Sequence, residues 1–318
     1  MSLYNSYQKL IKADVLFERS PLHAQYTGEL AAKHLKDKIE EGNPIMITRF
    51  GANELNCILN YHFINDSFAN NVKNIISGIP YFLKFKKGII KNLDEVAGFF
   101  PPTESNIIRF CQLSLQDLTE IDVLGSWLNH ESYLYPMMKP DHTRVRLRDL
   151  TPLTNNLSPW TEVLKGKKVL VIHPFEETIK RQYKNRHLLF ENHNMLPDFE
   201  LKTLKSVQSV ADNGSHTRFK DWFEALDYMK EAVENIDFDI AIIGCGAYGM
   251  PLAAHVKRIG KQAFHLGGET QIMFGIKGKR WEEPSYDYNN LFYNEHWVRP
   301  LDVDTPRNIN KVEEGCYW

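Results

Sequence analysis

An α/β fold with a Rossmann-like, mostly parallel sheet and helices on both faces is predicted from three observations. Short apolar runs, such as residues 240–243, alternate along the chain with stretches of helical periodicity. The runs are apolar at successive positions, as expected of strands that are covered on both sides. The chain has 318 residues, of which 43% are hydrophobic, enough to bury such a sheet. Ligands of this fold bind in the crevice at the carboxyl ends of the strands.

The first predicted elements are a helix, a buried strand and a second helix. Apolar residues on one helical face and the stop signals after them indicate the first helix: Tyr26, Leu30, Ala31, Leu35 and Ile39, then Gly42 and Pro44. Residues 44–48 form an apolar run that predicts the strand. The turn 49–51 follows, and a helical pattern resumes at 54–59.

The middle of the chain, residues 71–133, is helical in period but contains many turn residues. These are Gly78, Pro80, Gly98 and the pair Pro101-Pro102, and they predict several short helices. From residue 160 the signals are clearer. We expect, in order, a short helix at 160–164, a strand at 169–172, a helix through Ile179, Tyr183 and His187, and a strand at 201–207.

The clearest unit begins at Asp221. An amphipathic helix marked by Trp222, Leu226, Met229 and Val233 leads into the apolar run 239–243. A glycine turn, a helix at 249–259, a strand at 262–266 and a second glycine turn follow. This order predicts a βαβ unit with parallel strands.

Three parts are expected along the chain: an N-terminal arm at 1–21, the Rossmann-type domain at 22–280, and an aromatic-rich C-terminal extension at 281–318 that packs on the domain. The extension is rich in large rings, namely Trp281, Tyr286, Tyr288, Phe292, Tyr293 and Trp297. Such rings stack on a base or a sugar, and they also pin a terminal segment onto a domain. We favour pinning, and Trp281 is the ring to test for a ligand contact.

Composition excludes several classes of protein. The 38 basic and 40 acidic residues give a net charge of −2, so nucleic acid and anionic membranes are not expected partners. No apolar run is long enough to span a membrane, and the four widely spaced cysteines form no C-x-x-C pair. Neither a P-loop nor a G-x-S-x-G or H-E-x-x-H motif occurs. We therefore expect a cytoplasmic protein that recognises a small anionic ligand.

The first glycine turn, Gly244-Cys-Gly-Ala-Tyr-Gly249, matches G-x-G-x-x-G between a predicted strand and a predicted helix. With Gly246 and Tyr248 in it, the turn predicts backbone contact with a phosphate at a helix N-terminus. NAD(P) and S-adenosylmethionine are alternatives, but the next strand ends at His265 where a ribose-binding acid is expected. A purely structural turn remains open.

The second glycine turn comprises Gly267, Gly268 and the residues to Gln271, with Lys277, Lys279 and Arg280 soon after. Together they suit a pyrophosphate, which backbone N–H groups would bind and cations would neutralise. The alternative is a helix N-cap at Thr270 followed by solvated lysines.

The turn after the first strand holds Arg49, Gly51, Asn53 and Glu54. A guanidinium there suits a carboxylate or phosphate, and a carboxylate suits a base or a divalent metal. Alternatively, Glu54 only complements the helix dipole and Arg49 forms a surface ion pair.

Two histidines, His173 and His265, lie at the ends of predicted strands. Histidines at such places bind phosphate, act as acid or base, or are simply structural. Asp302-Val-Asp304 is formally a D-x-D triplet, but it lies between prolines with no flanking strand, so we expect a solvated loop.

These turns together resemble the GT-D fold glycosyltransferase group, particularly its GT-D-like branch of bacterial polysaccharide biosynthesis proteins. The resemblance covers residues 45–281 by order of elements. It implies a nucleotide-sugar donor, usually UDP-linked, transfer to an acceptor hydroxyl, and often Mn²⁺ or Mg²⁺. Characterised members resemble each other in an Arg-Phe-Gly-Asp-Gly-Glu stretch whose two acids serve the donor and the metal. This chain has Ala52 in place of the Asp, so of the two acids only Glu54 matches. Lys277, Lys279 or Arg280 could replace the charge of the metal.

The resulting expectation is a cytoplasmic glycosyltransferase with Arg49, Glu54 and His173 as catalytic residues and Glu54 as the sole acidic metal ligand. The residues expected to contact the donor are Gly51, Asn53, Gly244, Gly246, Tyr248, Gly249, His265, Gly267, Gly268, Gln271 and Lys277. Expected partners are a nucleotide-sugar and a glycan acceptor, with a homodimer as an open option. The alternatives are an NAD(P)- or S-adenosylmethionine-dependent enzyme and a catalytically inactive nucleotide-sugar-binding module.

Overall fold

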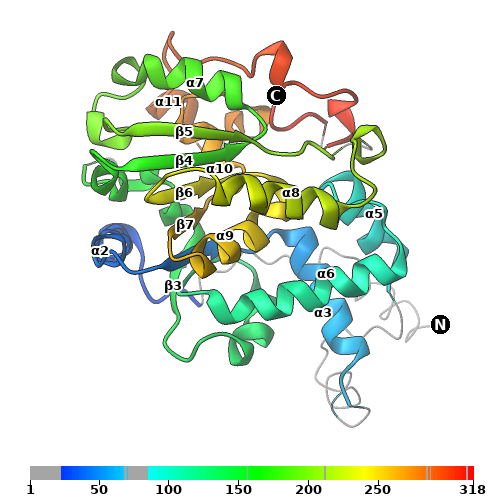
Figure 1. Cartoon of the computed structure of the whole chain (residues 1–318). Helices are drawn as coiled ribbons and strands as arrows, with labels where there is room; N and C mark the ends of the chain where they lie inside the picture. Colours follow the sequence, from blue (N-terminus) through cyan, green and yellow to red (C-terminus); the bar gives the residue numbers. More distant parts are fainter. Residues whose placement is uncertain are drawn as a thin grey trace, which may run out of the picture.

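A seven-stranded sheet in which every pair of neighbouring strands is parallel forms the centre of the described chain (Figure 1). Its order is β3-β2-β1-β7-β6-β4-β5. The strands are β1 (Ile45–Arg49), β2 (Val123–Ser126), β3 (Thr143–Arg146), β4 (Lys168–His173), β5 (Glu200–Lys205), β6 (Ile240–Ile243) and β7 (Gln262–His265). The predicted α/β class and the Rossmann-like parallel sheet are confirmed.

The computed structural model describes residues 23–67, 70, 85–155, 157–210, 213–283, 286, 288–312 and 314–318. The predicted arm at 1–21 lies outside these residues, as does most of the segment 68–84.

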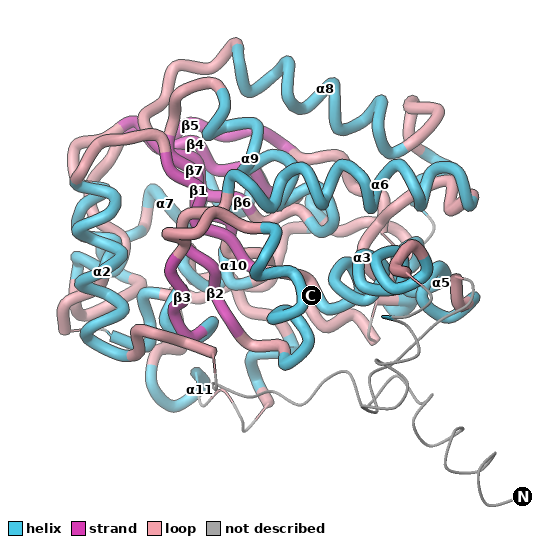
Figure 2. Tube along the Cα trace, turned by 90° about the horizontal axis from the view of Figure 1, so that it is seen from below, coloured by secondary structure: helices cyan, strands magenta, loops and turns pink. Residues whose placement is uncertain are grey.

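Each face of the sheet has its own hydrophobic cluster because side chains alternate along a strand. On one face, Met46, Leu170 and Ile243 pack against α3 (Ala52–Ile64), α5 (Lys87–Glu95), α6 (Glu104–Asp117), α8 (Trp222–Glu234) and α9 (Gly249–Arg258). On the other, Ile47 and Val171 pack against α2 (Gly28–Glu40), α7 (Glu176–Lys184), α10 (Glu269–Met273) and α11 (Tyr288–Leu291). Figure 2 shows α6, α8 and α9 on one side of the strands and α2 and α7 on the other. Helices therefore cover both faces, as predicted.

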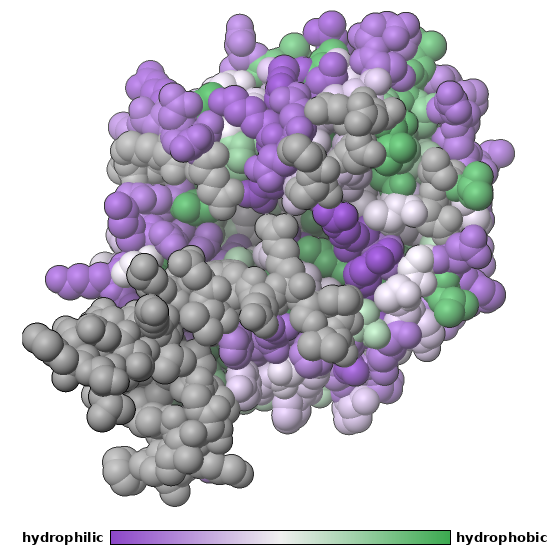
Figure 3. All heavy atoms as spheres, turned by 180° about the vertical axis from the view of Figure 1, so that it is seen from behind, coloured by the Kyte–Doolittle hydropathy of each residue, from purple (hydrophilic) through white to green (hydrophobic). Residues whose placement is uncertain are grey.

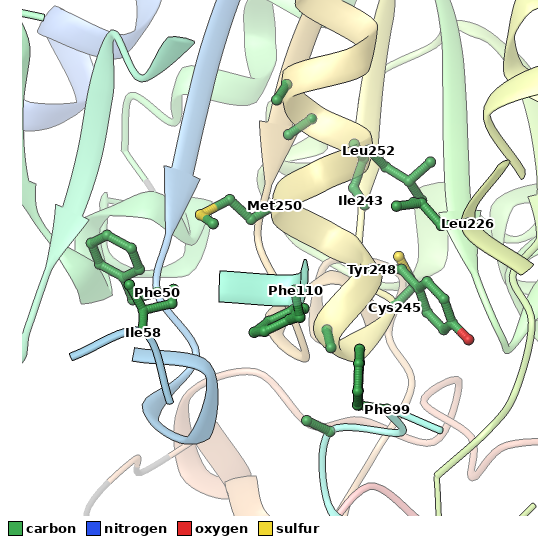
Figure 4. Close-up of a cluster of buried hydrophobic side chains, with 14 of the residues drawn as sticks. Phe50, Ile58, Phe99, Phe110, Leu226, Ile243, Cys245, Tyr248, Met250 and Leu252 are labelled. Atoms are coloured by element: carbon green, nitrogen blue, oxygen red, sulfur yellow. The ribbon is translucent and has the colours of Figure 1, made fainter. Parts of the chain in front are cut away.

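The N-terminal end of α9 is embedded in aromatic side chains. Phe99, Phe110 and Tyr248 gather around it (Figure 4), and the ring of Tyr248 stacks on Trp222 with centroids 5.0 Å apart. All of these rings except Phe99 come from or adjoin helices of the same face. This packing holds the turn after β6 at one position at the edge of the sheet.

Two strands were not predicted from the sequence, namely β2 and β3. Each has only four residues and neither is a continuous apolar run, since β2 ends in Gly125-Ser126 and β3 is Thr-Arg-Val-Arg; β2 also lies inside the segment that we expected to be helical. The start of the first helix was also predicted wrongly. The helix begins at Gly28, so Tyr26 lies before it and forms a β-bridge with Val145. Leu30 is 66% exposed and does not belong to the buried face of the helix.

The D-x-D triplet is not a solvated loop at its second acid. Asp302 is exposed, but the Asp304 side chain is buried, and its Oδ2 accepts hydrogen bonds from the N–H and hydroxyl of Thr178, both at 2.8 Å. Oδ1 accepts from Nζ of Lys205 at 3.1 Å. Asp304 thus binds the C-terminal part of the chain to the first turn of α7 and the end of β5.

Replacing Asp304 with asparagine is expected to lower the free energy of unfolding by about 2 kcal/mol, because the amide removes one acceptor from a buried, charge-assisted group. Urea unfolding of the variant measures this loss. Asp302→Asn is the matched control at the exposed acid and should stay within about 0.5 kcal/mol of the unmodified protein. Equal losses in the two variants would contradict the assignment.

No helix within the described ranges is long and apolar enough to cross a membrane. On the face shown in Figure 3, the described surface is mostly hydrophilic, and apolar side chains occur in small separate patches.

Candidate functional site

A cavity of about 800 Å³ lies at the carboxyl edge of the sheet, where the sequence predicts ligand binding. It is lined by residues at or just after the ends of all seven strands, together with residues from the C-terminal part of the chain. Segments that are far apart in the sequence meet there, since Arg49, Gly267 and Tyr317 all face it.

The cavity brings together most of the residues predicted from the sequence. Twelve line it: Arg49, Gly51, Asn53, Glu54, His173, Gly244, Gly246, Tyr248, His265, Gly267, Gly268 and Gln271. Gly249 and Lys277 do not. The ammonium of Lys277 lies 5.3 Å from the ring centre of Tyr293, and Lys279 donates to the carbonyl of Glu314 at 3.1 Å. Of the three cations predicted after the second glycine turn, Arg280 alone lines the cavity.

The two glycine turns meet at the floor of the cavity. A Cβ atom on Gly244 would lie 2.5 Å from the carbonyl oxygen of Gly267 and 2.8 Å from Cδ2 of His173. Gly267 has a φ of +66°, and a Cβ there would lie 3.1 Å from Nη1 of Arg49. Glycine is required at Gly244 because backbone and side-chain atoms approach it, and at Gly267 because of its positive φ and the nearby Arg49.

This floor lies beside the point where the strand order reverses. The chain leaves β4 through α7 toward the edge strand β5, but leaves the neighbouring β6 through α9 in the opposite direction to β7. Crevices at such points are the usual ligand sites of open α/β sheets.

The G-x-G-x-x-G glycines pack against protein atoms. The N–H of Ala247 donates to the carbonyl of Ala97 at 3.1 Å, and a Cβ on Gly246 would lie 2.9 Å from that same oxygen. A Cβ on Gly249 would lie 2.1 Å from Nε2 of His265. These contacts account for the motif by packing and favour the structural interpretation over a dinucleotide site. Thr270 is likewise not an N-cap, since it lies inside α10 and donates to the carbonyl of Ile243.

Arg49 is oriented by three contacts. Its Nε donates to the carbonyl of Phe50 at 2.9 Å, its guanidinium lies 4.9 Å from the ring centre of Trp127, and it borders Gly267. Trp127 is held in turn because its Nε1 donates to the same carbonyl of Phe50 at 3.0 Å. The expected surface ion pair is not found among the described residues. Arg49 instead holds its positive charge inside the cavity.

Two more arginines on the cavity wall lie over aromatic rings. Arg148 lies 5.3 Å from the ring centre of Tyr286, and Arg280 lies 4.8 Å from that of Tyr317. An aromatic face stabilises a guanidinium without cancelling its charge, and Arg280 also donates to the hydroxyl of Tyr317 at 3.2 Å and to Sγ of Cys316 at 3.3 Å. The arginine wall, as we call Arg49, Arg148 and Arg280, is therefore suited to a phosphate-bearing ligand.

Glu54 lies in the first turn of α3, with its carboxylate folded back toward Gly51. A Cβ on Gly51 would lie 1.9 Å from Oε2 of Glu54, so the glycine provides the space for this carboxylate. Burial raises the pKa of Glu54, opposed by a backbone hydrogen bond and by the charge of Arg49. A carboxylate with a raised pKa is a better proton acceptor than an exposed one.

His173 and His265 are buried and neutral. The N–H of Phe175 donates to Nδ1 of His173 at 3.0 Å, so the ring proton of neutral His173 is on Nε2. His265 shares a hydrogen bond of 2.9 Å with the hydroxyl of Thr48. Burial lowers the pKa of each histidine to about 3. His173 is consequently a hydrogen-bond donor at neutral pH, and the acid or base role expected from the sequence does not suit it.

These two low pKa values are an unfavourable contribution to the stability of the protein in acid. Each histidine has a folded pKa of about 3 against 6.5 when exposed, so the unfolded chain binds protons first as pH falls below 6.5. Asp117 acts in the opposite direction, because burial raises its pKa to about 6. From pH 6.5 to about pH 5, the two histidines should cost about 3 kcal/mol, whereas Asp117 should offset about 1 kcal/mol, and burial raises the pKa of Glu54, Glu131 and Glu269 in the same direction. Urea unfolding at the two pH values isolates one histidine when His173→Asn is compared with the unmodified protein: the variant should lose about 1.5 kcal/mol less, and an equal loss in both would contradict the assignment.

Several lining residues were missed by sequence reasoning: Trp127, Arg146, Arg148, residues 206–210, Glu269, Tyr317 and Trp318. Glu269 accepts from Nε1 of Trp281 at 3.0 Å, and its other oxygen has no hydrogen-bond partner among the described residues. Gln271 donates to the carbonyls of Ile276, Lys277 and Tyr317. Trp281 and Gln271 thus attach the C-terminal residues to α10, and Trp281, 1% exposed, is pinned in the wall rather than free to stack on a ligand.

The residues present do not fit Mn²⁺ or Mg²⁺. Within the part of the chain that the structure describes, no three His, Cys, Asp or Glu side chains come together as a metal site would require. Glu54 is a single carboxylate, and Arg49 next to it would repel a cation. The metal-ligand role expected for Glu54 is therefore not supported.

Comparison with protein-family models, curated proteins and solved structures finds no match for this chain. The class of protein defined here is a Rossmann-like α/β protein with a cationic, aromatic-lined cavity at the carboxyl edge of its sheet. Function is inferred from that cavity.

Proposed function

We propose that the protein is a glycosyltransferase of GT-D-like fold that transfers a sugar from a nucleoside diphosphate sugar, with UDP favoured, to a hydroxyl of a glycan or polysaccharide precursor. The observation that carries the proposal is the arginine wall, which lines a cavity of about 800 Å³ beside the point where the strand order reverses. That volume is within the usual range for small-molecule sites. A doubly charged diphosphate is the group that such a wall suits best.

Each part of the reaction has a residue suited to it. The acceptor oxygen forms a bond to the anomeric carbon of the sugar, the bond from that carbon to the phosphate oxygen breaks, and its electron pair leaves with the nucleoside diphosphate. Arg49, Arg148 and Arg280 stabilise the negative charge that develops on the leaving group. Glu54, whose pKa is raised by burial, accepts the proton of the acceptor hydroxyl.

Ligand-induced stabilisation tests the donor. UDP-, GDP- and CMP-sugars are each added to the protein and the melting temperature is recorded, since a ligand that binds only the folded state raises it. We expect the largest rise with a UDP-sugar, and the same rise after treatment with EDTA. Loss of the rise with EDTA would contradict a donor site made of arginines.

The activity itself is tested by release of UDP from the stabilising sugar donor in the presence of candidate glycans. Glu54→Gln should abolish release while leaving donor binding intact. Stabilisation without release from any acceptor would instead indicate an inactive nucleotide-sugar-binding module. Stabilisation by NAD(P) or S-adenosylmethionine alone would replace the proposal.

A further inference from the structure

Charged side chains are confined to one side of the cavity. Its arginines and carboxylates lie at the end of β1, β3 or β7, or after those strands. Arg49 ends β1, Arg146 ends β3, and Glu269 follows β7. The residues that follow β4, β5 and β6 contribute no arginine, lysine or carboxylate to the lining within the described ranges. Because β6, β4 and β5 are adjacent at one end of the strand order, this uncharged side is continuous.

Gly244 and Gly267 form the boundary between the two sides. Gly267 lies under the guanidinium of Arg49, Gly244 lies beside His173, and the two glycines nearly touch each other. A ligand bound to Arg49 can therefore extend across a floor without side chains to reach His173. A molecule with an anionic part joined directly to a neutral part matches this arrangement.

The uncharged side carries hydrogen-bonding groups suited to hydroxyls. His173 is 3% exposed, and its Nδ1 is engaged by Phe175, which makes Nε2 a donor. The hydroxyl of Ser206 on the neighbouring strand end is buried and has no hydrogen-bond partner among the described residues. Buried polar groups usually have partners, so one without any indicates a place where a ligand or water completes the site.

We infer that this uncharged side, lined by His173 and Ser206, is a subsite for the neutral, hydroxylated sugar ring of the donor, with His173 as its specificity-determining residue. The inference rests on the proposed function, because it requires the diphosphate to lie on the arginine wall. A sugar that carries a carboxylate is excluded from this side, since it would lose its water and find no cation there.

The first experiment compares three ligands on the unmodified protein by calorimetric titration: UDP, UDP-glucose and UDP-glucuronate. UDP-glucose should bind about tenfold more tightly than UDP, as expected from one or two additional hydrogen bonds. UDP-glucuronate should bind no more tightly than UDP. If UDP-glucuronate bound as tightly as UDP-glucose, the inference would be wrong while the proposed function stood, and binding of none of the three would overturn both.

The second experiment uses His173→Asn, which keeps an acceptor for the N–H of Phe175 but removes the Nε2 donor. This variant should lose the tenfold preference for UDP-glucose over UDP. His187→Asn, at a half-exposed histidine outside the cavity, is the matched control and should keep the preference. A preserved preference in folded His173→Asn, with folding checked by its melting temperature, would overturn the role of His173. Ser206→Ala provides a second test on the same side, with an expected loss of severalfold in the preference.

Discussion

Arg49→Ala is expected to weaken the binding of both UDP and UDP-glucose about 100-fold. The guanidinium faces the cavity, is oriented by Trp127 and Phe50, and has no carboxylate as an ion-pair partner among the described residues, so its N–H groups are available to a phosphate. Two charge-assisted hydrogen bonds lost from a site of low polarity account for about 3 kcal/mol, which corresponds to that factor. Calorimetric titration with UDP measures the change directly.

Two further variants identify the cause of this loss. Lys279→Ala removes a cation that lies near Arg280 in the sequence but outside the cavity, and should leave UDP binding within about twofold. Arg49→Lys keeps the charge but loses the planar fork and the stacking on Trp127, so it should restore only part of the affinity. A dissociation constant of Arg49→Ala close to that of the Lys279 variant would remove Arg49 from the ligand site.

Gly249→Ala is expected to lower the free energy of unfolding by about 3 kcal/mol. The backbone of Gly249 has φ −60° and ψ −51°, which alanine adopts readily, so the loss comes from contact alone. The new Cβ would lie 2.1 Å from Nε2 and 2.5 Å from Cδ2 of His265, a buried ring that is hydrogen-bonded to Thr48. Displacing that ring overpacks the core and breaks the hydrogen bond.

Gly88→Ala is the matched control because it makes the same substitution in another helix, α5, where nothing lies within 4 Å of the new Cβ. It should be neutral or stabilise the protein by up to about 1 kcal/mol, since alanine favours helix. Thermal and urea unfolding of the two variants should therefore shift in different directions. Similar stability of Gly249→Ala and the unmodified protein would show that His265 does not occupy the space beside Gly249.

The sequence predicts the parts of the fold in which strands are bounded by clear turns. Strands β1, β4, β6 and β7 were placed within about two residues because each is an apolar run followed by glycine, proline or a polar residue. Strands β2 and β3 were not predicted because neither is a continuous apolar run: β2 ends in Gly125-Ser126, and in β3 only Val145 is apolar and buried. For the same reason Arg146 and Arg148 were not predicted as cavity residues, because a residue cannot be placed at the edge of a sheet before its strand is known.

For the site, the sequence predicted which residues lie at the carboxyl ends of the strands, but not which side chains they contact in space. Gly244 and Gly267 were singled out correctly as cavity residues, yet only the structure shows that His173 and Arg49 occupy the space beside them. Lys277 was expected to face the ligand because it follows a glycine turn. Its N–H instead bonds to the carbonyl of Val298, and that pairing directs the side chain toward Tyr293. Closeness to a glycine turn in the sequence therefore does not determine the direction in which a side chain points.

The uncharged side of the cavity comes from one stretch of the chain, between the arginines at and after the end of β3 and the glycine turn after β7. The sheet consists of two contiguous runs, β1 to β3 and β4 to β7, that are joined by the pairing of β1 with β7. Residues 206–210 follow an edge strand on the uncharged side and are far from the arginines in the sequence. Insertions or exchanges in that loop would therefore change the group accepted on the uncharged side while the anion site stays intact, so the fold allows specificity to diversify by loop replacement.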